Sequence, residues 1–212
     1  MIKDGKNMKR ETLEIFDTML NDNPQLGKCR ADIMRAFEIM EEVYKYGKMV
    51  LICGNGGSSS DGQHIVGELM KGFKKKRPVA LNTKLDEAIQ MKLQDALPAV
   101  CLSSHESLTS AIANDVSADM MYAQQVYAYR KFTGTVLCIS TSGNAKNVNN
   151  AAIVARAYNI PIIGLTGEAG GALGCLADVV IHAPASETYR VQEFHLPIYH
   201  CLCAMLESEL FE

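Results

Sequence analysis

Short apolar runs alternate with helical segments along most of this chain, and no other feature limits its possible folds as strongly. Four runs have the length and composition of buried parallel strands and a fifth is plausible; they cover residues 49–53, 135–139, 161–165 and 179–182, with 99–102 as the fifth. Helical periodicity marks the segments between them, at 58–73, 117–132 and 145–158. Repeated alternation of strand and helix predicts an α/β fold with a parallel sheet and right-handed crossovers.

Two amphipathic helices are expected ahead of the first strand, within about residues 9–46. Apolar side chains recur there at helical spacing, and Asn23 and Pro24 separate the two apolar stripes. At the other end of the chain, residues 187–210 are expected to form one long helix. Pro197 lies within it and should kink the helix or delay its start.

Residues 80–97 are expected to form an inserted helix, because Leu85, Ile89 and Leu93 lie four residues apart. No internal repeat and no convincing linker divides the sequence. Residues 1–212 are therefore expected to form a single domain, of a length that can bury a sizeable core.

The composition excludes several classes of protein. Hydrophobic residues make up 48% of the chain, which is typical of a globular protein and not of a disordered one. A net charge of −3 and a pI near 6.0 do not favour nucleic acid as a partner. No apolar stretch approaches the roughly 18 residues of a membrane span, and the N-terminal residues lack the apolar core of a signal peptide. We expect a cytoplasmic protein without a membrane or nucleic-acid partner.

Two further features are given ordinary structural interpretations. The basic run at 71–77 is interpreted as a solvated helix end, because lysines are favourable where helices end. The seven cysteines are interpreted as buried reduced thiols, since their number is odd and no Cys-x-x-Cys pair is present.

Unusual polar loops follow two of the expected strands, at 54–60 and 140–145. Glycines there allow the backbone to approach a ligand, hydroxyls add hydrogen-bond donors, and the following helix start offers unpaired N–H groups. Neither loop is a P-loop, and the first does not match G-x-G-x-x-G. Ordinary turn and capping chemistry would explain one such loop, but two on one sheet favour an anion site such as phosphate.

Polar side chains also recur at helical spacing in two of the expected helices. His64 and Glu68 are four residues apart, which places an imidazole and a carboxylate on one helix face. Gln192 and His200 are eight residues apart in the apolar C-terminal helix. Each alone is more often a surface pair or a buried histidine with its hydrogen bonds satisfied.

Together these residues resemble a known family. The stretches CGNGGSSSDGQHIVGE, AIAND, ISTSGNAKNV, LTGEAGG and RVQEFHLPIYH are similar to the sugar isomerase (SIS) domain family and its phosphoheptose isomerase branch. The resemblance runs from about residue 29 to 210, interrupted by 80–97. It implies a three-layer α/β sandwich with a mostly five-stranded parallel sheet, preceded by a helical segment.

The resemblance also implies roles for particular residues. Sugar contacts would come from Asn114 and Asp115. Substrate would bind at the two polar loops, through Asn55, Gly56, Gly57 and Ser58 in the first and, for the phosphate, Ser140, Thr141 and Ser142 in the second. A divalent metal, zinc in this family, would be bound across a subunit boundary of a homotetramer by His64, Glu68, Gln192 and His200.

The implied reaction is a ketose–aldose isomerisation, most simply of sedoheptulose 7-phosphate to D-glycero-D-manno-heptose 7-phosphate through an enediol. Such a reaction needs a base for a carbon-bound proton and an acid near the carbonyl oxygen. The resemblance assigns these roles to Glu68 and His200. Gln192 would contribute to substrate binding as well as to the metal.

Three features depart from the isomerase pattern. Ala145 stands where the family commonly has a phosphate-binding serine, and Tyr189 stands where it has an aspartate that contacts the sugar. The third departure is the insertion at 80–97, which could cover the site or extend an oligomer interface.

The alternative function is a non-catalytic, sugar-phosphate-binding or regulatory SIS protein related to the DnaA initiator-associating protein. That branch carries asparagine at the position of His200, so the histidine present here favours the enzyme.

Overall fold

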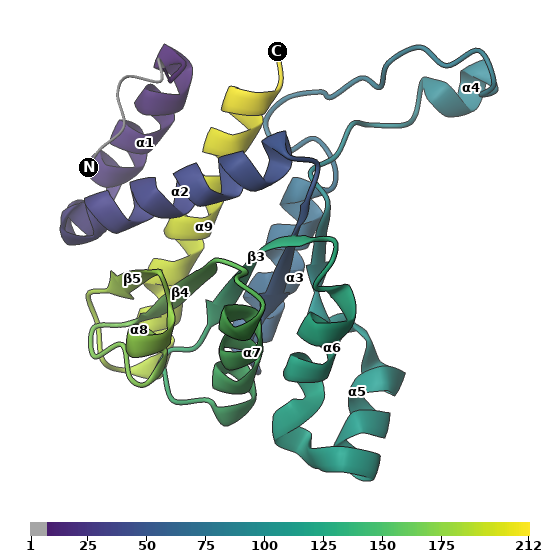
Figure 1. Ribbon diagram of the computed structural model, residues 1–212. Coiled ribbons are helices and arrows are strands. Elements are labelled where there is room, and N and C mark those ends of the chain that lie inside the picture. The colour runs from purple at the N-terminus through teal and green to yellow at the C-terminus, as the bar shows by residue number, and fades with distance from the viewer. Residues whose placement is uncertain (1–7) are drawn as a thin grey trace.

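The computed structural model describes residues 8–212 and contains a five-stranded, fully parallel sheet (Figure 1). The strand order is β2-β1-β3-β4-β5, so β1 and β3 are neighbours near the middle. Their pairing places Cys53 opposite Cys138. The strands are β1 (Met49–Cys53), β2 (Ala99–Cys101), β3 (Thr133–Ile139), β4 (Ile162–Gly167) and β5 (Val179–Ala183).

All five predicted strands are present, and their ends differ from the prediction by no more than two residues. The structure contains nine α-helices within residues 8–212. They are α1 (Arg10–Asp22), α2 (Arg30–Lys45), α3 (Gly57–Leu69), α4 (Glu87–Gln90), α5 (Glu106–Ile112), α6 (Met121–Tyr129), α7 (Lys146–Ala157), α8 (Leu173–Leu176) and α9 (Thr188–Leu210). Short 3-10 turns cover Pro24–Cys29, Leu102–Ser104 and Ala118–Met120, and a π-helical turn covers Ala113–Ser117.

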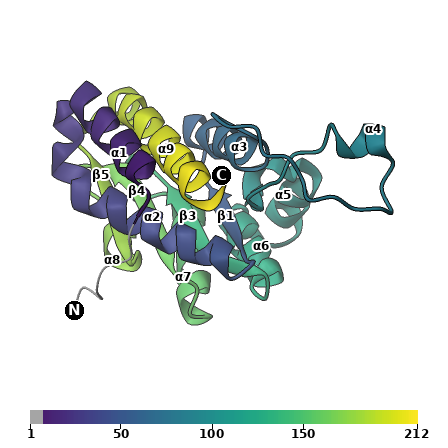
Figure 2. The same ribbon diagram turned by 90° about the horizontal axis from the view of Figure 1, so that it is seen from above.

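Helices cover both faces of the sheet, giving three layers (Figure 2). Alternate side chains of each strand enter different cores: Val50 and Ile52 pack beneath α2, α3 and α9, whereas Leu51 and Cys53 pack beneath α6, α7 and α8. Helix α1 lies outside this layer and packs against α9. The expected α/β sandwich with helices at its N-terminus is confirmed.

The long C-terminal helix forms as predicted, over Thr188–Leu210. Pro197 lies inside the continuous helix and does not delay its start. Helix α9 contacts α1, α2 and α3, and eight consecutive residues at 201–208 are buried. It therefore joins the N-terminal helices to the rest of the fold.

The interpretation of residues 71–77 as a solvated helix end is wrong at its last residue. Helix α3 ends at Leu69, and Arg77 is 1% exposed. The Arg77 guanidinium donates to Glu207 Oε1 at 2.7 Å and to the carbonyl of Leu69 at 2.7 Å. Glu207 also accepts from the backbone N–H groups of residues 73–75. The basic run thus ends in a buried ion pair with α9.

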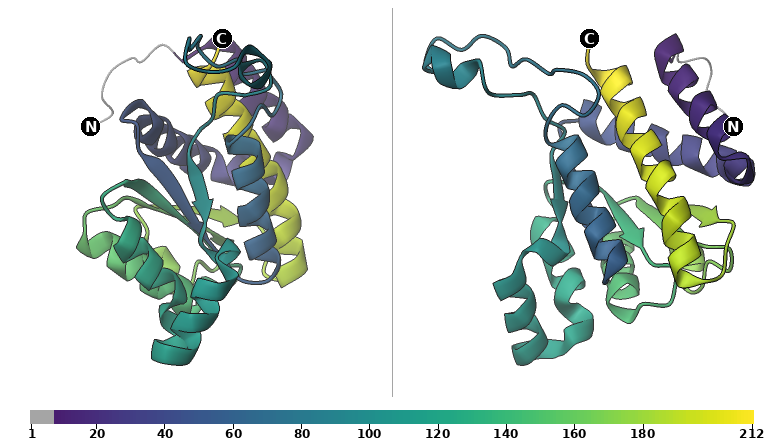
Figure 3. Two further views of the ribbon diagram at one scale, coloured as in Figure 1. Left: turned by 90° about the vertical axis from the view of Figure 1, so that its right-hand side faces the viewer. Right: turned by 180° about the vertical axis from the view of Figure 1, so that it is seen from behind.

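The prediction of an inserted helix at 80–97 is also wrong for most of that range. Residues 78–97 form an arm that projects from the body, with only the single turn α4 helical (Figure 3). One antiparallel bridge, Pro78 to Gln94, closes its base. Leu81 is 92% exposed and Met91 is 80% exposed. Apolar residues at helical spacing form a stable helix only where other parts of the protein pack against them. No part of the described chain packs over Leu85, Ile89 and Leu93.

Six of the seven cysteines are buried and all seven are free thiols, with only Cys175 exposed. Within residues 8–212, no helix has the length and apolar character needed to cross a membrane.

Candidate active site

The carboxyl ends of β1 and β3 lie side by side, because the two strands are parallel neighbours. The first polar loop follows β1, and α3 begins at Gly57. Gly56 has a φ of +53°, a conformation that glycine adopts without strain. Asn55 and Gly57 are exposed, whereas Ser58 is buried at the start of α3.

The second polar loop follows β3 and is held against the loop after β4. The N–H of Gly143 donates to Ser140, and the N–H of Gly167 donates to Thr141. Gly143 has a φ of +67°, and a Cβ atom there would stand 1.9 Å from the carbonyl oxygen of Gly170. Only glycine therefore fits at position 143, and the close approach fixes the direction of the hydroxyl-bearing residues before it.

The three hydroxyl residues of this loop differ in exposure. Ser140 is 6% exposed, Thr141 is intermediate and Ser142 is exposed. The Ser142 hydroxyl accepts from the N–H of Asn144 at 3.2 Å. Ala145 occupies the position before α7 and supplies no side-chain cap. The N–H of Val148 donates to Asn147 Oδ1 at 2.9 Å, so the N–H groups of Lys146 and Asn147 are the ones at the start of α7 that an anion could bind.

An amide pair joins the first polar loop to the first turn of α7, the helix that follows the second loop. Asn55 donates to Asn147 at 2.9 Å, and Asn147 returns a 2.9 Å bond to Asn55. The Tyr122 hydroxyl adds hydrogen bonds to Gly54 and Asn55. Sequence reasoning missed Asn147 and Tyr122, because their partners lie far away in the sequence. The only local signal was a second asparagine shortly after the glycine turn.

His64, Glu68 and His200 come together where α3 packs against α9. His64 Nε2 lies 3.3 Å from Glu68 Oε1 and 3.4 Å from His200 Nε2. The side chain of Glu68 is 13% exposed. Burial and the neighbouring His64 lower the pKa of His200 from its ordinary value, against the opposing effect of Glu68. His200 is therefore a neutral imidazole near pH 7, which suits a ligand or a proton carrier.

Gln192 lies elsewhere in the site. A Cβ atom at Gly57 would stand 2.4 Å from Gln192 Nε2, so the amide packs directly against the first polar loop. Gln192 is two helical turns before His200 on α9. Within the described chain it contacts the loop and is not bonded to the two imidazoles.

Asn114 and Asp115 form the π-helical turn after α5, and both are exposed. Asn114 Nδ2 donates to Asp115 Oδ1 at 2.8 Å. Among residues 8–212 no hydrogen bond joins either residue to the polar loops. Tyr189 lies in the first turn of α9 and is 60% exposed.

The chemistry of the donors fits a divalent metal. Two imidazole nitrogens and a carboxylate are zinc-type ligands, and tetrahedral ligands at about 2.0–2.1 Å stand about 3.3–3.4 Å apart. The two separations at His64 match that spacing. Within residues 8–212, however, no three His, Cys, Asp or Glu side chains are arranged to hold a metal on their own. The described chain therefore supplies suitable donors but not a closed ligand set.

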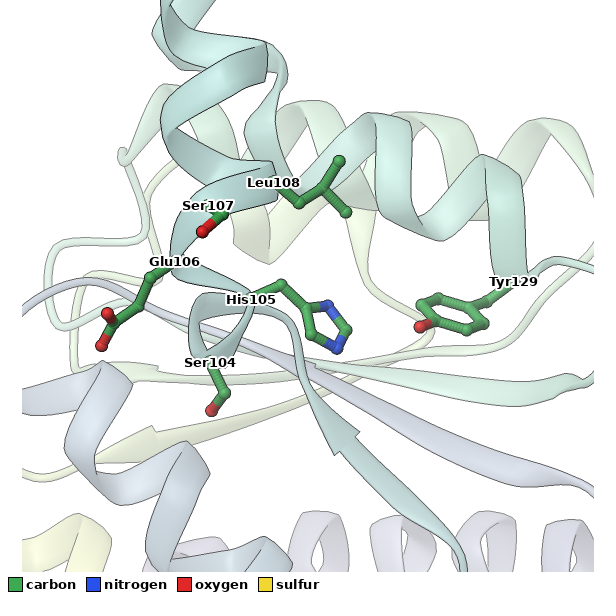
Figure 4. Close-up of a pocket in the computed structure, with 6 residues that line it drawn as sticks. All are labelled: Ser104, His105, Glu106, Ser107, Leu108 and Tyr129. Carbon is green, nitrogen blue, oxygen red and sulfur yellow. The ribbon is translucent and has the colours of Figure 1, made fainter.

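A separate open pocket of about 450 Å³ lies between the turn after β2 and α6 (Figure 4). The His105 ring points toward Tyr129, and His105 Nδ1 is 2.7 Å from Gln125 Oε1. None of the predicted site residues lines this pocket.

Comparison with known proteins gives the family context of this arrangement. Residues 26–167 match the SIS domain family. A phosphoheptose isomerase from Shewanella denitrificans is 38% identical over 182 residues, which cover 84% of each protein. A phosphoheptose isomerase from Trichlorobacter lovleyi is 36% identical over 181 residues, covering 85% of this chain and 84% of that protein.

The fold is similar to that of a solved structure as well. Phosphoheptose isomerase GmhA from Neisseria gonorrhoeae superposes with a TM-score of 0.72 and 28% sequence identity. The match covers 93% of this chain and 97% of the GmhA chain. The sequence matches and the structural match therefore both lead to phosphoheptose isomerases, and each covers most of this chain.

Proposed function

The chain belongs to the SIS domain family and to its phosphoheptose isomerase branch, and from that premise we propose that it is a ketose–aldose isomerase converting sedoheptulose 7-phosphate to D-glycero-D-manno-heptose 7-phosphate. The observation that carries the proposal is the meeting of His64, Glu68 and His200 on the helix pair α3–α9. Helix α3 begins at the polar loop of β1 and also carries His64 and Glu68, which supports a proposal in which base, acid and anion-binding groups serve one site.

Glu68 is proposed as the base. Its carboxylate takes a proton from C1 of the ketose, giving the enediol, and returns a proton to C2 of the aldose. His200 is proposed to move the accompanying proton between the oxygens on C2 and C1. Its lowered pKa supports this role, because a neutral imidazole can donate at one nitrogen and accept at the other.

The phosphate is proposed to bind at the second polar loop, through Ser140, Thr141, Ser142 and the N–H groups of the first two residues of α7. The first loop, with Asn55, Gly56, Gly57 and Ser58, is proposed to line the sugar site together with Gln192. The amide pair between the first loop and the start of α7 supports this division, because it fixes one loop relative to the other. Asn114 and Asp115 remain proposed sugar contacts.

Zinc belongs to the same proposal, with His64, Glu68 and His200 as ligands and Gln192 as a weaker fourth. When bound, a divalent metal would polarise the carbonyl and stabilise the negative charge of the enediolate. Since the described chain does not close the ligand set, we propose that a second copy completes the site within a homotetramer. A cytoplasmic location is part of the proposal, and the free thiols suit a reducing compartment.

A non-catalytic regulatory function is less favoured. Such a protein would need the two polar loops but not the clustered base and imidazoles. The relatives at 36–38% identity are all named as isomerases.

The proposal is tested by incubating the protein with sedoheptulose 7-phosphate in deuterated water, with and without added zinc. Proton NMR of the first two sugar carbons should show zinc-stimulated formation of the aldose and deuterium at its C2. A bound ligand that gives neither product nor exchange would contradict the isomerase and favour the regulatory protein.

A further inference from the structure

A lysine lies beside the proposed phosphate loop and is paired with a carboxylate of this chain. Lys146 is the first residue of α7 and follows the second polar loop directly. Its ammonium group forms an ion pair with Asp119 Oδ2, and its side chain is 78% exposed. From residue 133 to 155, a range that covers β3, the loop and most of α7, Lys146 is the only Lys, Arg or His. It is therefore the cation that the sequence places next to the loop.

The position of Lys146 is electrostatically unfavourable unless an anion is nearby. The start of a helix carries a partial positive charge that repels a lysine, and the first turn of α7 contains no acidic residue. Asp119 supplies the balancing anion. The Lys146 ammonium and the Ser117 hydroxyl lower the pKa of Asp119, which keeps it a carboxylate near neutral pH. A phosphate bound at the first N–H groups of α7 would balance the same positive charges, with close to two negative charges of its own.

The pair with Asp119 can be broken at little cost to the fold. Ion pairs between exposed side chains contribute little to stability, and a lysine has a flexible four-carbon stem. Asp119 is held in place by other bonds: its carboxylate accepts from the Ser117 hydroxyl, and its backbone carbonyl accepts from Asn150 Nδ2 at 2.9 Å. Asn150 is one turn after Lys146 on α7, so it keeps Asp119 against the helix whether or not the lysine is paired.

We propose that Lys146 is a substrate-binding residue that exchanges its ion pair with Asp119 for one with the phosphate group, and that Asp119 weakens phosphate binding by competing for the lysine. The inference rests on the proposed function for the place of the phosphate and adds to it the residue that neutralises the charge. The hydroxyls and N–H groups of the second loop are uncharged donors, and Ala145 adds no side-chain donor before the helix. Lys146 supplies the formal positive charge that these groups lack.

Three variants separate a direct contact from a general effect of charge. Lys146→Met keeps most of the apolar stem and removes the charge. Lys131→Met removes the same charge from an exposed lysine just before β3, at the opposite edge of the sheet from the loop, and is the matched control. Asp119→Asn removes the competing charge but keeps an oxygen that accepts from Ser117.

The affinity of the full-length protein for inorganic phosphate is measured by ³¹P NMR titration near pH 7.5 at low ionic strength, where such contacts are least screened. Lys146→Met should bind phosphate about tenfold more weakly than the wild type, and Lys131→Met should bind it equally well. Asp119→Asn should bind it about threefold more tightly. The double variant of Lys146 and Asp119 should bind as Lys146→Met does, because the carboxylate then has no lysine to withhold. An equal gain from Asp119→Asn with and without the lysine would overturn the exchange.

Ser142→Ala in the second loop tells failure of this inference from failure of the phosphate assignment. If Ser142→Ala weakens phosphate binding but Lys146→Met does not, the phosphate site stands and the role of Lys146 is overturned. If neither substitution changes the affinity, phosphate binds elsewhere and both assignments are overturned. The titrations involve no turnover, so an inactive protein would contradict the isomerase proposal without changing their outcome.

Discussion

Glu68 is the side chain on which the proposed chemistry depends most. Glu68→Gln keeps the shape and a hydrogen-bonding oxygen but removes the base, so turnover should fall by at least about 100-fold. Binding of a sugar phosphate should persist, because the two polar loops are untouched. Progress curves and calorimetric titration measure the two properties. Glu38→Gln, at an exposed position on α2, is the control. Turnover near the wild-type rate would remove Glu68 as the base.

His195 should make stability depend on pH. It is fully buried, and burial lowers its pKa from 6.5 to about 4, although a hydrogen bond to Thr166 opposes the change. The unfolded chain therefore binds a proton near pH 6.5 that the folded chain does not bind until near pH 4. Keeping His195 neutral therefore contributes to the free energy of unfolding in full above pH 6.5. That free energy declines by about 3 kcal/mol as the pH falls toward 4.

His195→Gln should flatten that decline while costing some stability at pH 7. Urea unfolding at several pH values between 7 and 4 measures the slope. A variant with the wild-type slope would show that another group causes the decline.

Single residues also show what the sequence could and could not predict. The i, i+4 spacing predicted the contact of His64 with Glu68, because a helix fixes it locally. The approach of His200 required the resemblance, since it depends on how α3 packs against α9. The partners of Tyr122 and Asn147 are set by the tertiary fold, so no local pattern identifies them beyond the presence of an asparagine after the glycine turn.

Among elements, the first polar loop and the start of α7 act together through the Asn55–Asn147 pair. Asn147→Ala removes the two hydrogen bonds to Asn55 and the one that Asn147 accepts from the N–H of Val148, so the first loop is no longer bonded to the start of α7. KM for the sugar phosphate should rise about tenfold, equivalent to about 1.4 kcal/mol, with a smaller effect on kcat. Steady-state kinetics measures both, and an unchanged melting temperature serves as the control for folding. Unchanged KM would mean that the loops bind substrate independently.

The elements were predictable to the extent that burial determines them. The five strands and α9 are buried runs, and the sequence pattern located them well. Residues 80–97 have a helical pattern but no surface to pack against, so the pattern was misleading there. The basic run at 71–77 was misjudged because Arg77 forms an ion pair with Glu207, which lies 130 residues further along the chain.

At the scale of the whole molecule, Glu207 on α9 binds the segment just before the projecting arm, through Arg77 and the N–H groups of residues 73–75. Burial raises its pKa, but the N–H groups of Phe73 and Lys74 and the Arg77 guanidinium outweigh burial, so the pKa is lowered overall. A carboxyl whose folded pKa is below its unfolded value stabilises the fold above about pH 4.5. That contribution is lost as the pH falls through the folded value.

Glu207→Gln should therefore destabilise the protein by about 3 kcal/mol at pH 7 and weaken its loss of stability below pH 4.5. Urea unfolding provides the measurement. Glu14→Gln breaks the exposed pair with Arg10 and should cost no more than about 1 kcal/mol. Equal effects of the two variants would contradict a structural role for the buried pair.

The projecting arm has a consequence for proteolysis. Lys84 and Lys92 are exposed on it, so brief trypsin treatment should cut there first and give two fragments on a denaturing gel. The nicked protein should still migrate as one species on a native gel, because β1 from the first fragment lies between β2 and β3 from the second. The same geometry means that the two halves, expressed as separate chains, should reassemble. Resistance of both lysines to trypsin would instead reveal that another molecule covers the arm.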